Sequence, residues 1–196
     1  MFALLLLIIL FVCLVFVDIY SPPRVIEGVL TDEEIDIIFK EASDKFVTSK
    51  TIGGDSQNIR RSKQVFLENT PETLKIINKV KRLVNMEHSD NERIQVVKYE
   101  PGDYYRPHQD TCCFGGNREG CQGADKRRLT VIVYMNDDFE GGGTNFPNLN
   151  MYLKPKKGDA IVFNTLGMFN RCSRYALHEG TPVKSGTKYI STFWIR

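Results

Sequence analysis

The sequence lacks a strong charge excess of either sign, internal repeats, and low-complexity segments beyond one glycine triplet. Its formal net charge is +2, from 26 Lys and Arg against 24 Asp and Glu. A nearly neutral chain argues against nucleic acid as a partner, because such binding needs a dominant basic surface. The hydrophobic share of 42% is ordinary, so we expect one globular domain with a sizeable core and no nucleic-acid partner.

The sequence also has no C-x-x-C pair among its five cysteines. Cys13 lies in a hydrophobic run, which leaves an even number, Cys112, Cys113, Cys121 and Cys172. One or two disulfides are expected if the domain faces an oxidising compartment, and their pairing stays open. A zinc site is the weaker alternative, because adjacent cysteines rarely bind one zinc ion together.

Basic residues are missing ahead of the longest hydrophobic run, residues 2–17. As a helix this run would span roughly 24 Å, which Ile19 and Tyr20 could extend toward a bilayer core of about 30 Å. A cleaved signal peptide would need a basic start and a small-x-small cleavage site. We therefore expect an uncleaved signal-anchor helix over residues 1–20 and a membrane-anchored protein in the endoplasmic reticulum or secretory lumen. A cleaved signal, giving a secreted protein, and a buried core helix remain open.

Helical patterns precede strand patterns along the rest of the chain. Residues 21–30 are expected to be a linker stiffened by Pro22 and Pro23, and residues 31–196 the domain. Thr31-Asp-Glu-Glu34 is a capping box that opens a helix, and Thr70-Pro71 opens a second one. The apolar face of this second helix is predicted to comprise Leu74, Ile77, Val80, Leu83 and Val84. Short β-branched or aromatic segments follow at 94–99, 129–135, 160–164 and 189–195, which indicates an α+β domain around a sheet sandwich or barrel.

His108, Asp110 and His178 are the residues that point to a chemistry. His108 and Asp110 form a His-x-Asp pair, and residues two apart on an extended segment face the same side. Two imidazoles and one carboxylate leave metal positions open, which suits non-haem Fe(II) with a cosubstrate and O2. Lys188 follows His178 at a distance that would let a cation hold the far end of a dicarboxylate. The third histidine, His88, is expected to be a solvated surface residue.

The order of the motifs around this triad resembles a known family. Tyr99, His108-x-Asp110, Arg127-x-x-Thr130, Gly141-Gly-Gly-Thr-x-Phe-Pro147, Lys156-Lys-Gly158, His178 and Lys188 follow one another along the chain. This order is similar to that of the prolyl 4-hydroxylase catalytic domain, in the Fe(II)- and 2-oxoglutarate-dependent dioxygenase superfamily. The resemblance implies a double-stranded β-helix (jelly-roll) core with supporting N-terminal helices.

The resemblance also implies roles for individual residues. His108, Asp110 and His178 would be the iron ligands, and Lys188 would pair with the C5 carboxylate of 2-oxoglutarate. Tyr99 would donate its hydroxyl to the same carboxylate, Thr130 would be a further contact, and Trp194 matches a tryptophan near the cosubstrate pocket. The implied cofactors are Fe(II), 2-oxoglutarate and L-ascorbate.

The activity implied by the resemblance is peptidyl-proline 4-hydroxylation with O2, coupled to oxidative decarboxylation of 2-oxoglutarate to succinate and CO2. The expected partner is a proline-rich peptide or protein. Two alternatives remain: hydroxylation of another side chain or a small molecule, and a non-catalytic binder of proline-rich segments. Two features depart from the family pattern. Gly143 stands where glutamate is frequent, and residues 111–125 match no family motif and are expected to form a substrate lid.

Overall fold

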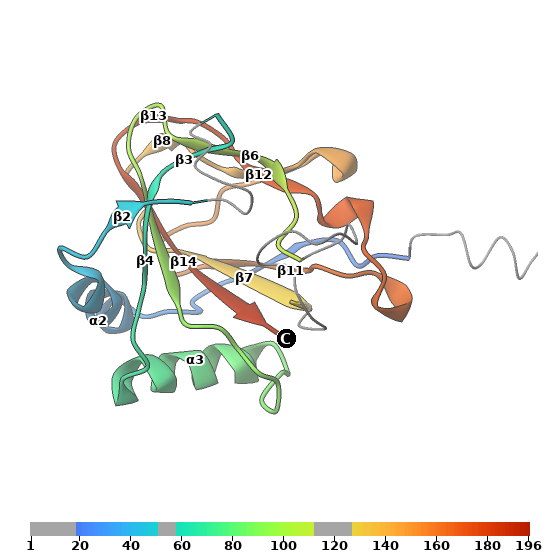
Figure 1. Cartoon of the computed structure of the whole chain (residues 1–196), viewed down its shortest axis with the longest axis horizontal. Helices are drawn as coiled ribbons and strands as arrows, with labels where there is room; N and C mark the ends of the chain where they lie inside the picture. Colours follow the sequence, from blue (N-terminus) through green and yellow to red (C-terminus); the bar gives the residue numbers. More distant parts are fainter. Residues whose placement is uncertain (1–18, 51–57, 112–126) are drawn as a thin grey trace, which may run out of the picture.

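The computed structural model of the chain describes residues 19–50, 58–111 and 127–196 (Figure 1). Its described part is rich in β-strands and contains two α-helices, α2 (Asp32–Ala42) and α3 (Pro71–Leu83). Three short 3-10 helices also occur, η1 (Pro147–Leu149), η2 (Met168–Asn170) and η3 (Arg174–Ala176).

The strands of the described residues form a seven-stranded sheet, a five-stranded sheet and a two-stranded ribbon. Neighbouring strands within each sheet pair in antiparallel fashion. The seven-stranded sheet has the order β1 (Arg24–Ile26), β11 (Ala160–Asn164), β7 (Leu129–Tyr134), β14 (Lys188–Ile195), β5 (Gln95–Tyr99), β4 (Lys63–Phe66) and β2 (Val47–Thr48). The five-stranded sheet has the order β10 (Met151–Leu153), β9 (Thr144–Phe146), β12 (His178–Gly180), β6 (Tyr104–His108) and β3 (Arg60–Arg61). The ribbon consists of β13 (Val183–Ser185) and β8 (Glu140–Gly141).

Two layers of buried side chains result from the alternation of residues along the central strands. Odd-numbered residues of β7, such as Val131 and Val133, belong to the cluster that packs under the helices. Even-numbered residues, such as Ile132 and Tyr134, belong to the cluster on the opposite face of the sheet. Figure 1 shows both helices on one side of the seven-stranded sheet and the five-stranded sheet on the other. This arrangement is consistent with the expected jelly-roll core.

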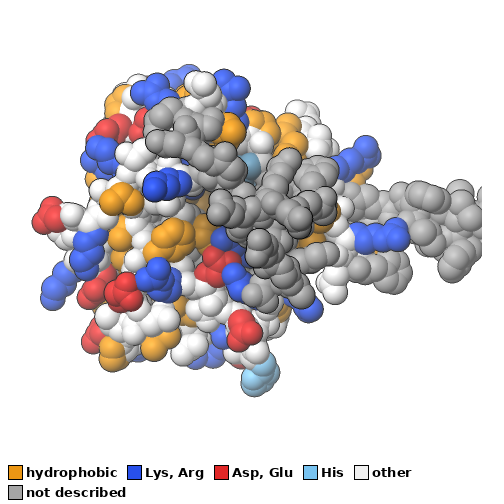
Figure 2. All heavy atoms as spheres, in the orientation of Figure 1, with side chains coloured by type: hydrophobic (Ala, Val, Ile, Leu, Met, Phe, Trp, Pro, Cys, Tyr) orange, Lys and Arg blue, Asp and Glu red, His pale blue; other side chains and the backbone are white. Residues whose placement is uncertain are grey.

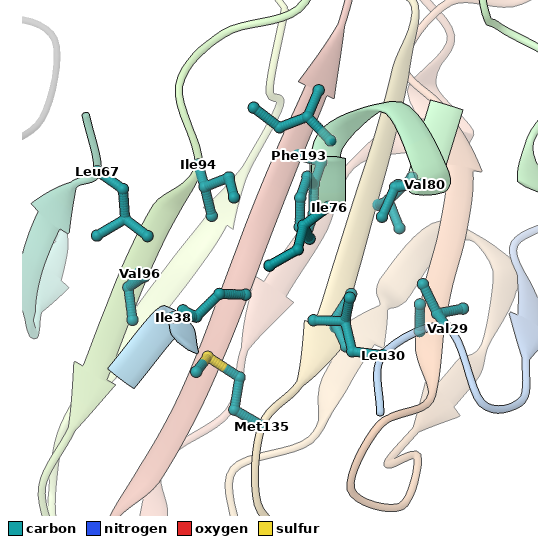
Figure 3. Close-up of a cluster of buried hydrophobic side chains, with 14 of the residues drawn as sticks. Val29, Leu30, Ile38, Leu67, Ile76, Val80, Ile94, Val96, Met135 and Phe193 are labelled. Atoms are coloured by element: carbon teal, nitrogen blue, oxygen red, sulfur yellow. The ribbon is translucent and has the colours of Figure 1, made fainter. Parts of the chain in front are cut away.

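Both helices begin where the sequence predicts. The capping box of α2 is present, because Thr31 Oγ1 accepts from the backbone N–H of Glu34 and a Glu34 carboxylate oxygen accepts from that of Thr31. Thr70 caps α3 in the same way, with Pro71 in the first turn. Figure 3 shows Ile38 of α2 and Ile76 and Val80 of α3 directed at the sheet, toward residues such as Phe193.

The buried face of α3 differs from the predicted one. Ile77, Val80 and Val84 are buried as expected, but Leu74 and Leu83 are exposed. Ile76, which the prediction leaves out, is among the buried residues of this helix. The buried face of α3 is therefore rotated about the helix axis relative to the predicted apolar face, because contact with the sheet and α2 decides which side is buried.

Truncation on the two sides of α3 is expected to have different effects on stability. Ile76→Ala should lower the free energy of unfolding by about 2–5 kcal/mol, because it leaves a cavity in a close-packed layer. Leu74→Ala, the matched control, should change it by less than about 1 kcal/mol, since Leu74 is 40% exposed and Ile76 only 2%. Urea unfolding followed by circular dichroism measures both. Equal losses would contradict the observed orientation of the helix.

The segment 21–30, expected to be a linker, contributes to the domain. Arg24–Ile26 pair with β11 as an edge strand, and Val29 and Leu30 are buried in the core. The backbone of Leu30 also packs tightly on the turn before β11. A Cβ at Gly158, whose φ is +85°, would lie 2.7 Å from the Leu30 carbonyl oxygen, so glycine is required there.

The expectation of a membrane-anchored protein in the endoplasmic reticulum or secretory lumen is wrong for the structure as described. No helix within residues 19–50, 58–111 and 127–196 is both long enough and apolar enough to cross a bilayer. Ile19 and Tyr20, which were to extend the anchor helix, are not helical. The apolar run at residues 2–17 lies outside the described residues.

Two smaller expectations concern the cysteines and the charges. Cys172 is disulfide-bonded, in agreement with the expectation of one or two disulfides, while Cys112, Cys113 and Cys121 lie outside the described residues. The same holds for the proposed lid, except for Thr111. Basic and acidic side chains are interspersed on the face shown in Figure 2, in keeping with the nearly neutral net charge.

Candidate active site

Strand pairing brings the two distant histidines together. His108 ends β6, His178 begins β12, and the two are direct cross-strand partners in the five-stranded sheet. Cross-strand partners project from the same face, so both imidazoles point into the space between the sheets. Asp110 follows two residues after His108. Ligand atoms of all three residues lie within 4.8 Å of one another, as the His-x-Asp…His pattern predicts.

Backbone carbonyls orient both imidazoles. His108 Nδ1 lies 2.9 Å from the carbonyl oxygen of Arg106, and His178 Nδ1 lies 3.0 Å from that of Ala176. A carbonyl can only accept, so each Nδ1 carries a proton, and Nε2 is the ring atom directed toward a metal position. These Nε2 atoms face Asp110, at 3.6 Å from Oδ1 for His108 and 3.8 Å from Oδ2 for His178.

The protonation states also fit a divalent cation. Burial, reinforced by the nearby His178, lowers the pKa of His108 well below its ordinary value. Burial alone would raise the pKa of Asp110, but His178, His108 and Arg127 outweigh it and lower the pKa. At neutral pH the site therefore holds a neutral imidazole at His108 and an ionised carboxylate at Asp110, the states in which these groups bind metal. The donor set, its spacing and its protonation fit Fe(II).

Lys188 is a buried cation in the same cavity. It is 2% exposed, and within the described residues no carboxylate forms a salt bridge with it. Its Nζ donates to the Gly142 carbonyl oxygen at 2.6 Å and lies 3.5 Å from the Tyr134 hydroxyl. Burial, with a smaller contribution from Lys154, lowers the pKa of Lys188 to about 7. An ammonium group held this way is suited to an anionic ligand.

Two tyrosines and one threonine lie at the Lys188 end of the cavity. Tyr99, the cross-strand partner of Lys188, has its ring centroid 5.2 Å from Nζ, and the Tyr134 ring centroid is 4.7 Å away. The Tyr134 hydroxyl is hydrogen-bonded to Thr144 Oγ1 at 3.0 Å. Burial raises the pKa of Tyr99 and of Tyr134, so both hydroxyls remain donors. The sequence prediction includes Tyr99 but misses Tyr134 and Thr144.

Thr130 and Trp194, the other two predicted cosubstrate contacts, lie at the opposite end from Lys188. Thr130 Oγ1 donates to Asp110 Oδ2 at 2.8 Å, so its hydroxyl serves the triad. Trp194, the cross-strand partner of Thr130, lies beneath Arg127, whose guanidinium carbon is 3.6 Å from the centroid of the ring. Its Nε1 is buried and has no hydrogen-bond partner within the described residues.

Arg60 and Tyr105 form a wall of the site, and neither is among the predicted site residues. The Tyr105 ring stacks on His108 with centroids 3.4 Å apart, and the Arg60 guanidinium carbon is 4.6 Å from the centroid of Tyr105. Arg60 is buried and donates to Ser62 Oγ. It belongs to the two-residue strand β3, which has no alternating pattern that could have revealed it.

One cavity of about 800 Å³ contains the triad, Lys188 and these walls. Lys188, Tyr99 and Thr144 line it on one side of the histidines, and Arg127 and Trp194 on the other. Ligand sites of proteins commonly have volumes of about 300–1,000 Å³. The cavity therefore offers room for a small dicarboxylate beside the metal position and for part of a larger molecule.

The glycine at position 143, a departure from the family pattern, has a local structural explanation. A Cβ there would lie 2.2 Å from Cζ of Tyr152, and the backbone N–H of Gly143 donates to the Tyr152 hydroxyl at 3.2 Å. The tyrosine thus occupies the space that a side chain at 143 would need.

Known proteins are similar to this chain in sequence and fold. The family model described as the 2OG-Fe(II) oxygenase superfamily matches residues 94–196. A protein of Acanthamoeba polyphaga mimivirus, provisionally named a prolyl 4-hydroxylase, is 38% identical over 183 residues, which cover 91% of this chain and 76% of the viral protein. The human prolyl 4-hydroxylase subunit alpha-1 is 29% identical over 191 residues, 91% of this chain but 35% of the subunit.

A solved structure matches over nearly the whole chain. The viral collagen prolyl hydroxylase of Paramecium bursaria Chlorella virus-1, solved as a 2-oxoglutarate complex, superposes with a TM-score of 0.69 at 29% identity and covers 90% of this chain and 96% of the viral one. The order of motifs, the paired strands that carry the histidines and these relatives lead to one assignment. The chain belongs to the 2OG-Fe(II) oxygenase superfamily and, within it, to the prolyl 4-hydroxylases, dioxygenases that use Fe(II) and 2-oxoglutarate to hydroxylate proline.

Proposed function

We propose that His108, Asp110 and His178 hold Fe(II) and that Lys188 anchors 2-oxoglutarate for the 4-hydroxylation of proline in a peptide. The single observation that carries this proposal is the presence, in one cavity, of a metal-ready triad and a buried ammonium group that forms no salt bridge with a carboxylate of the described residues. When bound, the iron and 2-oxoglutarate supply the oxidative chemistry that activates O2 for C–H hydroxylation, with succinate and CO2 as coproducts. The side chains of the protein position the reactants and limit the access of water.

The cosubstrate end consists of one cation and neutral donors. Lys188 pairs with the C5 carboxylate, and the hydroxyls of Tyr99 and Tyr134 orient it, because a charged group with fixed donors is a strong carboxylate receptor. Thr144 replaces Thr130 as the threonine at this end, since it is bonded to Tyr134 and lines the cavity. L-Ascorbate is proposed as the reductant that restores Fe(II) after uncoupled turnovers.

Aromatic residues exclude water around the buried histidine. The rings of Phe163 and Phe146 lie 4.7 Å and 5.7 Å from the His178 ring, centroid to centroid. On the far side, Tyr105 and Trp194 line the part of the cavity left for the peptide. Flat aromatic surfaces suit a proline ring and the polyproline II conformation of proline-rich segments.

The proposed activity is tested with a panel of proline-rich peptides, Fe(II), 2-oxoglutarate and ascorbate. The expected result is a peptide mass gain of one oxygen at proline, in a one-to-one ratio with succinate. The matched control replaces the target proline by alanine and should give neither product above background. Oxygen gain at another residue would favour the alternative hydroxylase, and tight peptide binding without succinate would favour the non-catalytic binder.

A further inference from the structure

Asp110 is held at two points by residues at the start of one strand. Thr130, fully buried on β7, donates to Asp110 Oδ2 at 2.8 Å. Arg127, just before β7, donates from Nη1 to the Asp110 backbone carbonyl at 3.0 Å. Asp110 lies beyond the end of β6, so these contacts replace the strand pairing that fixes His108.

Arg127 is itself held in place. Its guanidinium forms two hydrogen bonds with the Glu92 carboxylate, at 2.6 Å and 2.7 Å, and stacks on Trp194. The backbone of Asp110 is therefore anchored by a paired guanidinium, while the orientation of its carboxylate depends on Thr130. The two contacts act on different parts of the same residue.

The two carboxylate oxygens of Asp110 consequently differ. Oδ2 accepts the Thr130 hydrogen bond and lies 3.8 Å from His178 Nε2, whereas Oδ1 lies 3.6 Å from His108 Nε2. A carboxylate that binds a metal through both oxygens takes one more coordination position than one that binds through a single oxygen. Bidentate binding would reduce the positions open to a chelating cosubstrate and O2.

We propose that Thr130 is a positioning residue that orients Asp110 and reserves Oδ1 as the single oxygen offered to the metal. This proposal rests on the proposed function, because it assumes that the triad binds the metal. It assigns Thr130 to the metal ligand instead of the cosubstrate. Outer hydrogen bonds of this kind change metal affinity by about 10–100-fold when they are removed.

A comparison of threonine, valine, serine and alanine at position 130 separates the effect of the hydroxyl on metal binding from that of the methyl group. Threonine and valine have nearly the same volume and differ by the hydroxyl, and serine and alanine form a second such pair. The full-length apo-protein of each variant is titrated with Co(II) alone, while its visible absorption reports the coordination of the bound ion. Thr130→Val and Thr130→Ala are expected to raise the Co(II) dissociation constant by about 10–100-fold and to change the spectrum. Thr130→Ser should stay close to the wild type on both readouts.

Two further variants make the result decisive. Ser191→Ala removes a buried hydroxyl on the adjacent β14 that has no hydrogen-bond partner in the part of the chain that the structure describes, and it should leave Co(II) binding unchanged. Asp110→Ala should abolish high-affinity Co(II) binding. Two outcomes would overturn the role of Thr130 and leave the metal site standing. The first is loss of binding in Asp110→Ala with unchanged affinity in Thr130→Val. The second is equal weakening of binding in Thr130→Ser and Thr130→Ala. Retained high-affinity binding in Asp110→Ala would overturn the proposed metal site and this inference with it.

Discussion

Alanine at His178 is expected to reduce coupled formation of succinate and hydroxyproline by at least about 10³-fold, since metal-assisted catalysis contributes several kcal/mol to the barrier. His178 is buried, its Nδ1 is bound to a backbone carbonyl, and its Nε2 faces Asp110. The variant removes one of the three side chains that form the candidate metal site among the described residues. Activity is measured as succinate release and as oxygen gain by mass spectrometry, at saturating 2-oxoglutarate.

The matched control is His88→Ala, which removes an exposed histidine after α3. It should leave both products at the wild-type level. Because the His178 ring packs against Phe163 and Phe146, its loss also opens a cavity, so thermal unfolding must show that His178→Ala is folded at the assay temperature. Substantial coupled turnover in a folded His178→Ala protein would remove His178 from the metal site.

Sequence order predicts the centre of the site for a physical reason. The His-x-Asp spacing places His108 and Asp110 near each other in any extended segment. The link to His178 needs topology, and the family resemblance supplies it through the antiparallel pairing of β6 and β12. The same holds for Lys188, which pairs with Tyr99 in the opposing sheet. For His178 and Lys188, strand pairing thus brings together side chains that the order of motifs along the chain already suggests.

Other features of the site and of the fold depend on side-chain direction or on weak local patterns. Thr130 and Thr144 both lie on strands next to the cavity. Only the structure shows that the Thr130 hydroxyl donates to Asp110, whereas Thr144 is hydrogen-bonded to Tyr134, whose hydroxyl lies 3.5 Å from Lys188 Nζ. Arg60 comes from a strand of two residues, too short for any periodicity. The expected linker at 21–30 contains β1, a strand of three residues whose pairing with β11 decides its structure.

Lys188→Met is expected to weaken 2-oxoglutarate binding while stabilising the ligand-free protein. Loss of one partner from a buried ion pair costs roughly 3–5 kcal/mol, which corresponds to a rise of about 10²-fold to 4 × 10³-fold in the 2-oxoglutarate dissociation constant. In the ligand-free protein, the buried ammonium has no carboxylate partner among the described residues. Its replacement by an apolar chain of similar length should therefore raise the melting temperature. Isothermal titration with the metal-loaded protein and thermal unfolding of the apo-protein measure the two effects.

The pH dependence follows from the pKa of Lys188, which burial and Lys154 lower from 10.5 to about 7. Between these values the unfolded chain binds more protons at this site than the folded one. The free-energy cost of burying the protonated Lys188 is therefore fully present in the apo-protein below pH about 7, and it decreases as the pH rises toward 10.5. In the wild type, 2-oxoglutarate affinity should fall by up to about tenfold per pH unit above this pKa, because the carboxylate binds the ammonium form.

Lys154→Met provides the discriminating variant for this pH profile. Removal of that cation should raise the pKa of Lys188 and shift the fall in 2-oxoglutarate affinity to higher pH, while affinity at low pH stays near the wild-type value. In Lys188→Met this component of the pH dependence should disappear. A wild-type affinity that does not change between pH 6 and pH 9, the range of about one to two units around the pKa, would mean that Lys188 remains charged throughout. A melting temperature of the apo-protein that falls in Lys188→Met would mean that the ammonium group stabilises the fold instead of straining it.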